Sequence, residues 1–254
     1  MYSIGIDVGS VAAKAAVFDG QKIIAKEIMP TGWSPRESGT LILAQALRAA
    51  QIEKDQVKKI VGTGYGRVAL SFIDKKVTEI TCHGRGAHFV APDIRTVIDI
   101  GGQDSKVIKL DAKGNVVDFI MNDKCAAGTG RFLQVMAHAL EMDVSDLSNA
   151  GKDAVPQNVN SMCTVFAESE VISLRANGAS KESIAAGLLE AVCKKTYSLV
   201  SKVGVVDKVF FSGGVSRNPL LVELLGEKLG VRVFSSDESQ FLGAIGAAVL
   251  GYDE

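Results

Sequence analysis

Asp99-Ile-Gly-Gly-Gln-Asp104 follows an apolar run that begins at Thr96, and Asp7-Val-Gly-Ser10 follows a similar run at the start of the chain. Each segment also precedes a second strand-like run. A shift of 92 positions superimposes the two segments and aligns five identical pairs, which are Ile6/Ile98, Asp7/Asp99, Gly9/Gly101, Lys14/Lys106 and Asp19/Asp111. Five matches in one register predict an internal structural duplication.

Hydrophobic periodicity predicts an α/β fold on either side of these segments. In the first part of the chain we expect strands at 4–8, 13–18, 22–29, 59–62 and 77–81, with helices at 38–50, 67–73 and 85–90. In the second part we expect strands at 96–100, 105–110, 116–121, 208–212 and 231–235, with helices at 129–140, 145–150, 165–176, 181–203, 218–229 and 239–250. Two similar lobes with a cleft between them follow from this order.

The expected division places an N-terminal lobe at 1–94 and a C-terminal lobe at 95–235. Residues 236–254 are expected to form a helix that packs back on the N-terminal lobe. Pro92-Asp93 is the expected seam, because no low-complexity linker separates the halves.

The composition is that of an ordinary globular protein, with 47% hydrophobic and 22% charged residues among 254. A formal net charge of −1 gives no electrostatic reason to expect nucleic acid or an acidic membrane as a partner. The chain shows no secretory signal and no apolar run of the length a membrane helix requires. We therefore expect a cytoplasmic protein.

Glycine gives the two duplicated turns the property that matters for phosphate binding. Without a Cβ, the backbone N–H groups at Gly9-Ser10 and at Gly101-Gly102 can approach an anion closely. Asp7 and Asp99 each stand at a strand end, where a carboxylate can hold Mg²⁺ through water. Lys14 is a candidate for contacting a phosphate oxygen, although it can equally be a solvated strand residue.

A third glycine turn, Ser212-Gly-Gly-Val-Ser-Arg-Asn218, follows the apolar strand that ends at Phe211. Its position before a helix suits packing against a nucleoside, so Gly213, Gly214 and Asn218 are candidate cofactor-binding residues. The chain contains no Gly-x-x-x-x-Gly-Lys-Ser/Thr run and is therefore not a P-loop protein. Gly62-Thr-Gly-Tyr-Gly66 does not complete the dinucleotide-binding pattern, and we expect a loop there.

Two of the four cysteines stand in helix-entry motifs. Asn122-Asp-Lys-Cys-Ala-Ala-Gly-Thr-Gly-Arg131 contains Cys125 together with Gly128 and Gly130, two further candidate cofactor-binding glycines. Cys163 follows 38 positions after Cys125, directly before another expected helix. A helix N-terminus favours negative charge and hence a thiolate. Cys193 lies on the apolar face of an expected helix and Cys82 beside His83, so both are expected to be structural.

These motifs together resemble those of a known group of ATPases. The paired Asp-x-Gly turns and the late Ser-Gly-Gly turn resemble the actin, sugar-kinase and heat-shock-chaperone ATPase superfamily. The Cys125 motif and Cys163-Thr-Val-Phe-Ala-Glu-Ser-Glu170 resemble the activators of 2-hydroxyacyl-CoA dehydratases and the related benzoyl-CoA reductase ATPase subunits. The similarity runs almost from end to end of the chain.

That resemblance implies an oxygen-sensitive homodimer that binds ATP or ADP with Mg²⁺ and holds one 4Fe–4S cluster between its subunits. ATP would drive a low-potential electron from ferredoxin or flavodoxin into a dehydratase or related reductase. Thiolates are soft ligands that suit such a cluster, which takes four of them. Cys125 and Cys163 supply two, and a two-fold dimer would supply four. A four-cysteine cluster within one chain stays an alternative.

Gln103 and Asp104 are the candidates for orienting the attacking water, as a glutamine does in some NTPases. Two rival functions stay open at this point. One is a small-molecule kinase of the same fold that acts on a sugar or amino sugar. The other is a non-redox nucleotide switch that binds a protein partner.

Overall fold

The computed structural model describes residues 1–159, 163–206 and 208–253. It divides into two compact units. The N-terminal unit comprises Met1–Val97, Ile108–Asp118 and Asp237–Glu254, and the C-terminal unit comprises Ile98–Val107 and Phe119–Ser236. The division passes through three strands, because β6, β7 and β8 each have residues in both units.

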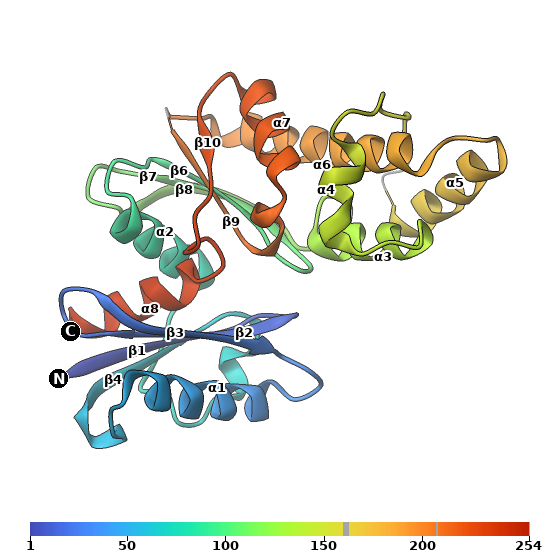
Figure 1. The fold of residues 1–254 in the computed structure, drawn as a ribbon. Helices are drawn as coiled ribbons and strands as arrows, with labels where there is room; N and C mark the ends of the chain where they lie inside the picture. The colour runs from blue at the N-terminus through green and yellow to red at the C-terminus, as the bar shows by residue number, and fades with distance from the viewer. Residues whose placement is uncertain (160–162, 207, 254) are drawn as a thin grey trace. The chain divides into compact units, whose positions relative to one another are not determined.

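The first sheet has the order β3-β2-β1-β4-β5. Its strands are β1 (Tyr2–Val8), β2 (Ala12–Phe18), β3 (Ile23–Pro30), β4 (Val57–Thr63) and β5 (Lys75–Lys76). β1 pairs with β2 in antiparallel fashion, with Asp7 opposite Lys14, and it pairs with β4 in parallel. Helix α1 (Pro35–Ala50) covers one face of this sheet and α8 (Leu242–Tyr252) covers the other (Figure 1).

The second sheet has the order β10-β9-β6-β7-β8. Its strands are β6 (Thr96–Ile100), β7 (Ser105–Leu110), β8 (Val116–Asn122), β9 (Val209–Ser212) and β10 (Val233–Phe234). Read from the other end, this order repeats the first sheet, with β6, β7, β8, β9 and β10 in the places of β1 to β5. The predicted duplication and the α/β fold class are therefore confirmed.

Local sequence explains where the main helices begin and end. The hydroxyl groups of Ser34, Thr78 and Ser180 accept backbone N–H groups at the starts of α1, α2 (Glu79–Val90) and α6 (Lys181–Val203). Such caps replace hydrogen bonds that the first turn of a helix lacks. The other helices are α3 (Gly130–Ala139), α4 (Leu147–Gly151), α5 (Thr164–Ala176) and α7 (Pro219–Leu229).

Two local predictions are wrong. The β-branched run 77–81 is not a strand, because Thr78 caps α2 and the helix starts at Glu79. The expected helix at 67–73 is only a short 3₁₀ turn at Tyr65–Ala69. In the first case, packing of α2 against α8 outweighs the strand preference of valine, isoleucine and threonine.

Each unit has its own core. In the N-terminal unit, buried residues of β1, β2 and β4 pack against Ile42, Leu43 and Ala46 of α1. The opposite face of the sheet packs on α8 so closely that a Cβ on Gly5 would overlap the Ala244 carbonyl. In the C-terminal unit, Ile98, Ile100 and Val107 of the sheet belong to one cluster with residues of α3, α5, α6 and α7.

Candidate functional site

The first glycine turn lies in the N-terminal unit, directly after β1. Asp7 is buried, and its Oδ2 lies 3.5 Å from the Lys14 ammonium. The Gly9 N–H donates to the Ala12 carbonyl over 3.1 Å, and the Thr31 hydroxyl donates to the Gly9 carbonyl over 2.7 Å. These bonds fix the turn, and Ser10 at its tip is exposed.

The second turn repeats this geometry in the C-terminal unit. The Gly101 N–H donates to the Asp104 carbonyl over 2.9 Å, as the Gly9 N–H does to Ala12. The Lys106 ammonium lies 3.3 Å from Asp99 Oδ2, as Lys14 lies beside Asp7. Gln103 is exposed. The duplicated sequence thus produces duplicated contacts as well as a duplicated topology.

The third turn docks on the second. Gly213 has φ +86°, a left-handed conformation that favours glycine, and a Cβ there would overlap the Ile100 carbonyl. The hydroxyl of Ser212 donates to Asp99 Oδ1 over 2.7 Å. The predicted site residues Gly101, Gly213 and Gly214 are therefore neighbours within one unit.

Asn218 has a structural role that the sequence analysis missed. Its side-chain oxygen accepts the Leu221 N–H over 2.9 Å and so caps α7. An asparagine followed by proline is a recognisable start signal for a helix, so the sequence did contain the information.

The segment that follows Cys125 is hydrogen-bonded to the second glycine turn. The Gly130 N–H donates to the Gly101 carbonyl over 2.9 Å, and the Arg131 N–H donates to the Gly102 carbonyl over 2.8 Å. Gly130 and Arg131 are the first residues of α3. Gly128, just before them, has φ +85°. The helix that follows Cys125 therefore begins on the backbone of the second glycine turn.

Burial divides the four cysteines, all of which are free thiols. Cys82 and Cys193 are buried, and burial raises the pKa of Cys82 to about 12 and the pKa of Cys193 to about 11. Cys125 is half-buried, and Cys163 is exposed at the N-cap of α5. The two thiols of the sequence motifs are thus the more accessible ones.

Neither a closed metal site nor a membrane helix is present among the residues that the structure describes. In those ranges, no three His, Cys, Asp or Glu side chains converge as metal ligands would. None of the helices described there combines the length and apolar composition that a membrane crossing requires.

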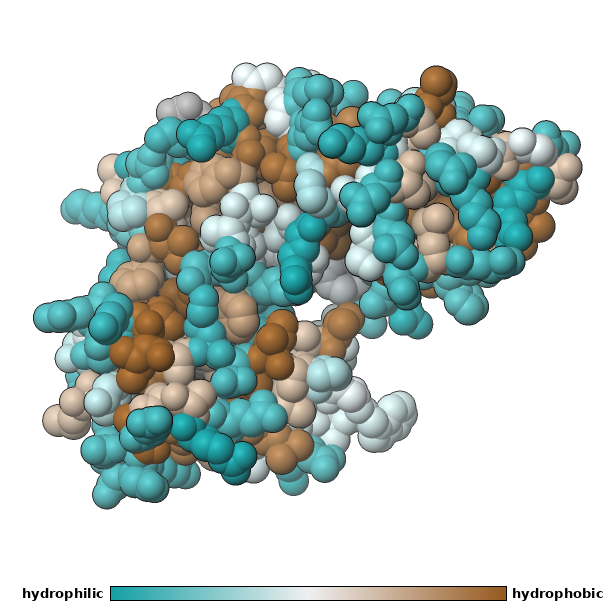
Figure 2. Space-filling model, in the orientation of Figure 1, coloured by the Kyte–Doolittle hydropathy of each residue, from teal (hydrophilic) through white to brown (hydrophobic). Residues whose placement is uncertain are grey.

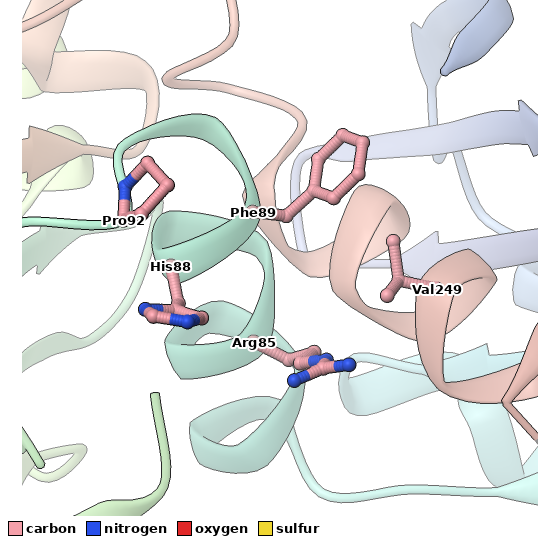
Figure 3. A pocket seen from close by; sticks show the side chains of 5 residues that line it. All are labelled: Arg85, His88, Phe89, Pro92 and Val249. Carbon is pink, nitrogen blue, oxygen red and sulfur yellow. The ribbon is translucent and has the colours of Figure 1, made fainter. Parts of the chain in front are cut away.

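A pocket of about 260 Å³ lies elsewhere in the N-terminal unit (Figure 3). Its lining comprises Arg85, His88, Phe89, Pro92 and Val249. Burial lowers the pKa of His88, and the nearby guanidinium groups of Arg85 and Arg95 lower it further. None of the predicted site residues lines this pocket.

Two residues that contact the second turn, Lys106 of β7 and Ser212 of the third turn, escaped the sequence analysis as site residues. Lys106 entered it only as one half of an aligned pair, and Ser212 only as the first letter of a glycine turn. Both contact Asp99. The contact between Ser212 and Asp99 spans 113 positions, so no local pattern could have shown it.

The comparisons with known proteins agree with this geometry. The profile of the BadF/BadG/BcrA/BcrD ATPase family matches residues 4–251. The chain is similar to component A of (R)-2-hydroxyglutaryl-CoA dehydratase from Acidaminococcus fermentans, with 43% identity, a TM-score of 0.95 and coverage of 100% of this chain and 98% of that one. It is also similar to the activator of the 2-hydroxyisocaproyl-CoA dehydratase from Clostridium difficile with bound ADPNP, with 42% identity, a TM-score of 0.93 and coverage of 100% and 95%.

A more distant likeness concerns the fold alone. The ROK hexokinase from Thermus thermophilus has 16% identity and a TM-score of 0.58, with 99% of both chains covered. The duplicated sheets and their glycine turns thus define an ATPase of the actin and sugar-kinase fold class. Within that class, the chain belongs to the BadF/BadG/BcrA/BcrD ATPase family.

Proposed function

We propose that this protein is an iron–sulfur ATPase that couples ATP hydrolysis to delivery of a low-potential electron to a 2-hydroxyacyl-CoA dehydratase. Two relatives with at least 42% identity are a component and an activator of such dehydratases. The observation that carries the proposal is the pair of hydrogen bonds from Gly130 and Arg131 to the carbonyls of Gly101 and Gly102. They join the phosphate turn to the helix that follows Cys125.

Nucleotide binding is assigned to the three glycine turns. Asp7 and Asp99 would hold Mg²⁺ near the phosphates, with Gly9, Ser10, Gly101 and Gly102 cradling the anion. Gly213 and Gly214 would pack against the nucleoside. Asp104, whose side chain is 25% exposed against 4% for Asp99, is the carboxylate of the second turn that solvent reaches. Asp104 or Gln103 would therefore orient the attacking water.

Cys125 and Cys163 fit the ligand set of an iron–sulfur cluster. Cys163 is exposed and is the N-cap of α5, whose N-terminus favours anionic sulfur. Cys125 is half-buried and precedes α3 by five residues. A 4Fe–4S cluster takes four thiolates, so one chain would supply half of the shell. When bound, the cluster would supply one-electron storage at low potential.

The other half of the shell would come from a second copy of the chain. Val165, Phe166 and Ile172 of α5 are 68%, 69% and 57% exposed. Val165 and Ile172 lie seven residues apart, on one face of the helix that begins beside Cys163. Apolar residues appear at the surface along this end of the C-terminal unit in Figure 2. A two-fold dimer would bury this face and bring two pairs of cysteines together.

The hydrogen bonds of α3 suggest how nucleotide state would reach the thiols. A change at Gly101-Gly102 on hydrolysis would be passed to Gly130 and Arg131, and so to the segment that carries Cys125. Such loop shifts driven by a γ-phosphate are a common form of switch. The electron donor would be a reduced ferredoxin or flavodoxin, and the compartment would be the cytoplasm.

Iron analysis of anaerobically purified protein tests the proposal. We expect about four irons and four sulfides per dimer. Cys125→Ser and Cys163→Ser should each lose the iron, because each removes two of four ligands from the dimer. Cys193→Ser is the matched control and should keep it, since Cys193 is buried in the core.

Electron delivery is the second readout. The reduced protein should pass electrons to a partner dehydratase only with Mg²⁺ and ATP present. A colourless, iron-free wild type with full ATPase activity would contradict the redox assignment. A phosphorylated sugar among the products would point instead to a kinase of this fold.

A further inference from the structure

Lys106 on β7 is a buried lysine that contacts two carboxylates. Its side chain is 3% exposed, and its ammonium lies 2.7 Å from Asp104 Oδ2 and 3.3 Å from Asp99 Oδ2. The Ser212 hydroxyl donates to the other oxygen of Asp99. One buried cation therefore joins the carboxylate before the second phosphate turn to the carboxylate after it.

The duplicated lysine in the N-terminal unit shows what is special about this arrangement. Among the residues that the structure describes, Asp7 is the one carboxylate within 4 Å of the Lys14 ammonium, and the Lys14 side chain is 18% exposed. The position that matches Asp104 is Ala12, since 104 − 92 = 12. Lys14 is thus placed to meet a phosphate oxygen, whereas Lys106 is held inside the protein by two anions.

The physical reason to retain such a lysine is the cost of the two carboxylates. Carboxylates close together repel each other, and a buried one is strongly disfavoured without a paired cation. An ammonium that contacts both balances the repulsion and restricts each side chain to the rotamer that keeps the contact. A Cβ on Gly101 would lie 2.6 Å from Asp104 Oδ1, so this carboxylate is held directly against the phosphate turn.

We propose that Lys106 is a positioning residue for ATP hydrolysis, which fixes the side chains of Asp99 and Asp104 around the second phosphate turn without contacting the nucleotide itself. The proposal rests on the ATPase part of the proposed function and does not depend on the cluster. The two duplicated lysines then have different roles. Lys14 binds phosphate, and Lys106 orders the carboxylates of Asp99 and Asp104, which act on Mg²⁺ and water.

Steady-state ATPase kinetics of Lys106→Gln test this role, with Lys14→Gln as the matched variant. Glutamine keeps hydrogen-bond donors but removes the charge. We expect Lys106→Gln to lower kcat by about 100-fold, the size of effect that a misplaced reacting group produces, and to change the Kd for ATP by less than about threefold. Lys14→Gln should show the reverse pattern, with the Kd for ATP raised by about tenfold or more.

A double-mutant cycle separates positioning from a general loss of stability. Asp104→Asn alone should also lower kcat by about 100-fold. If Lys106 acts through Asp104, the double variant Lys106→Gln/Asp104→Asn should lose no more than the worse single variant. The double variant has one carboxylate fewer beside the missing cation, so it also serves if Lys106→Gln alone does not fold. Circular dichroism melting of each variant identifies those that fold.

Two outcomes would overturn the positioning role. One is a loss of kcat in the double variant that equals the product of the two single losses. The other is a raised Kd for ATP in Lys106→Gln. The wild type reports on the proposed function separately. If the wild type hydrolyses ATP but holds no iron, the proposed electron-transfer function is contradicted and the Lys106 measurements stay valid. If the wild type has no ATPase activity, both the proposed function and the role of Lys106 are contradicted.

Discussion

Cys82 and Cys193 lie in the apolar cores of the N-terminal and C-terminal units, whereas solvent reaches Cys163 at the N-cap of α5 and, in part, Cys125 in the segment before α3. A thiol reacts as the thiolate, and burial without a nearby cation keeps the thiol protonated. Because the pKa of Cys82 is raised to about 12 and that of Cys193 to about 11, both remain neutral at pH 8. The two classes should therefore differ in reactivity.

Alkylation with iodoacetamide at pH 8 should label Cys163 first and Cys125 next in protein freed of metal by a chelator. Cys82 and Cys193 should remain unlabelled, and mass spectrometry of peptides reads all four. The same reaction in denaturant is the control and should label every cysteine. Rapid labelling of Cys82 in the native protein would contradict the burial described above.

Some contacts of the candidate site could be predicted from the sequence and others could not. Asp7, Asp99, Lys14 and Lys106 could be paired by the 92-residue shift, because the duplication repeats local strand–turn–strand geometry. The links of Asp99 to Ser212 and of Gly101 to Gly130 could not, since they join segments that meet only in the folded unit. The capping by Asn218 could be predicted from the proline that follows it.

At the scale of elements, glycines decide how closely α2 and α8 approach. A Cβ on Gly246 of α8 would overlap the Cys82 carbonyl of α2, and one on Gly86 of α2 would overlap the Leu242 carbonyl. These are backbone atoms, so a side chain could be accommodated only by separating the helices. Residues 79–84 could not be predicted as helix from local preferences, because the close packing of α2 on α8 is what stabilises the helix there.

Gly246→Ala should therefore destabilise the protein by about 3 kcal/mol, because overpacking between two backbones cannot relax. Gly226→Ala in α7 is the matched control. The nearest atom to its Cβ would be the Val231 carbonyl oxygen at 3.5 Å, so the better helix former should stabilise by about 0.5–1 kcal/mol. Thermal or urea unfolding followed by circular dichroism measures both, and equal effects would refute the packing argument.

For the whole molecule, the two sheets of equal order show one strand topology used twice. The sequence predicted this architecture because duplication leaves matched turns. What it could not show is which surface stays uncovered, since α5 has an ordinary helical pattern with small and polar residues among the apolar ones. The exposed α5 face defined by Val165, Phe166 and Ile172 appears only once the helix is placed on its unit.

Phe166→Glu and Ile172→Glu should each convert the proposed dimer to a monomer, because a charge on the α5 face would be buried without a partner. Size-exclusion chromatography with light scattering measures the mass, and iron content should fall with the dimer. Val155→Glu is the control, since Val155 is also exposed in the C-terminal unit but lies outside α5. Dimers that survive both α5 substitutions would exclude this face as the interface.

The position of α8 has a consequence for synthesis on the ribosome. The first sheet is synthesised well before the helix that covers one of its faces, because that helix comprises Leu242–Tyr252. At about 5–20 residues per second, that face stays uncovered for ten seconds or more. The exposed apolar face of the nascent sheet should then bind chaperones. A chain truncated after Ser236 would lack α8, and we expect proteases to degrade it.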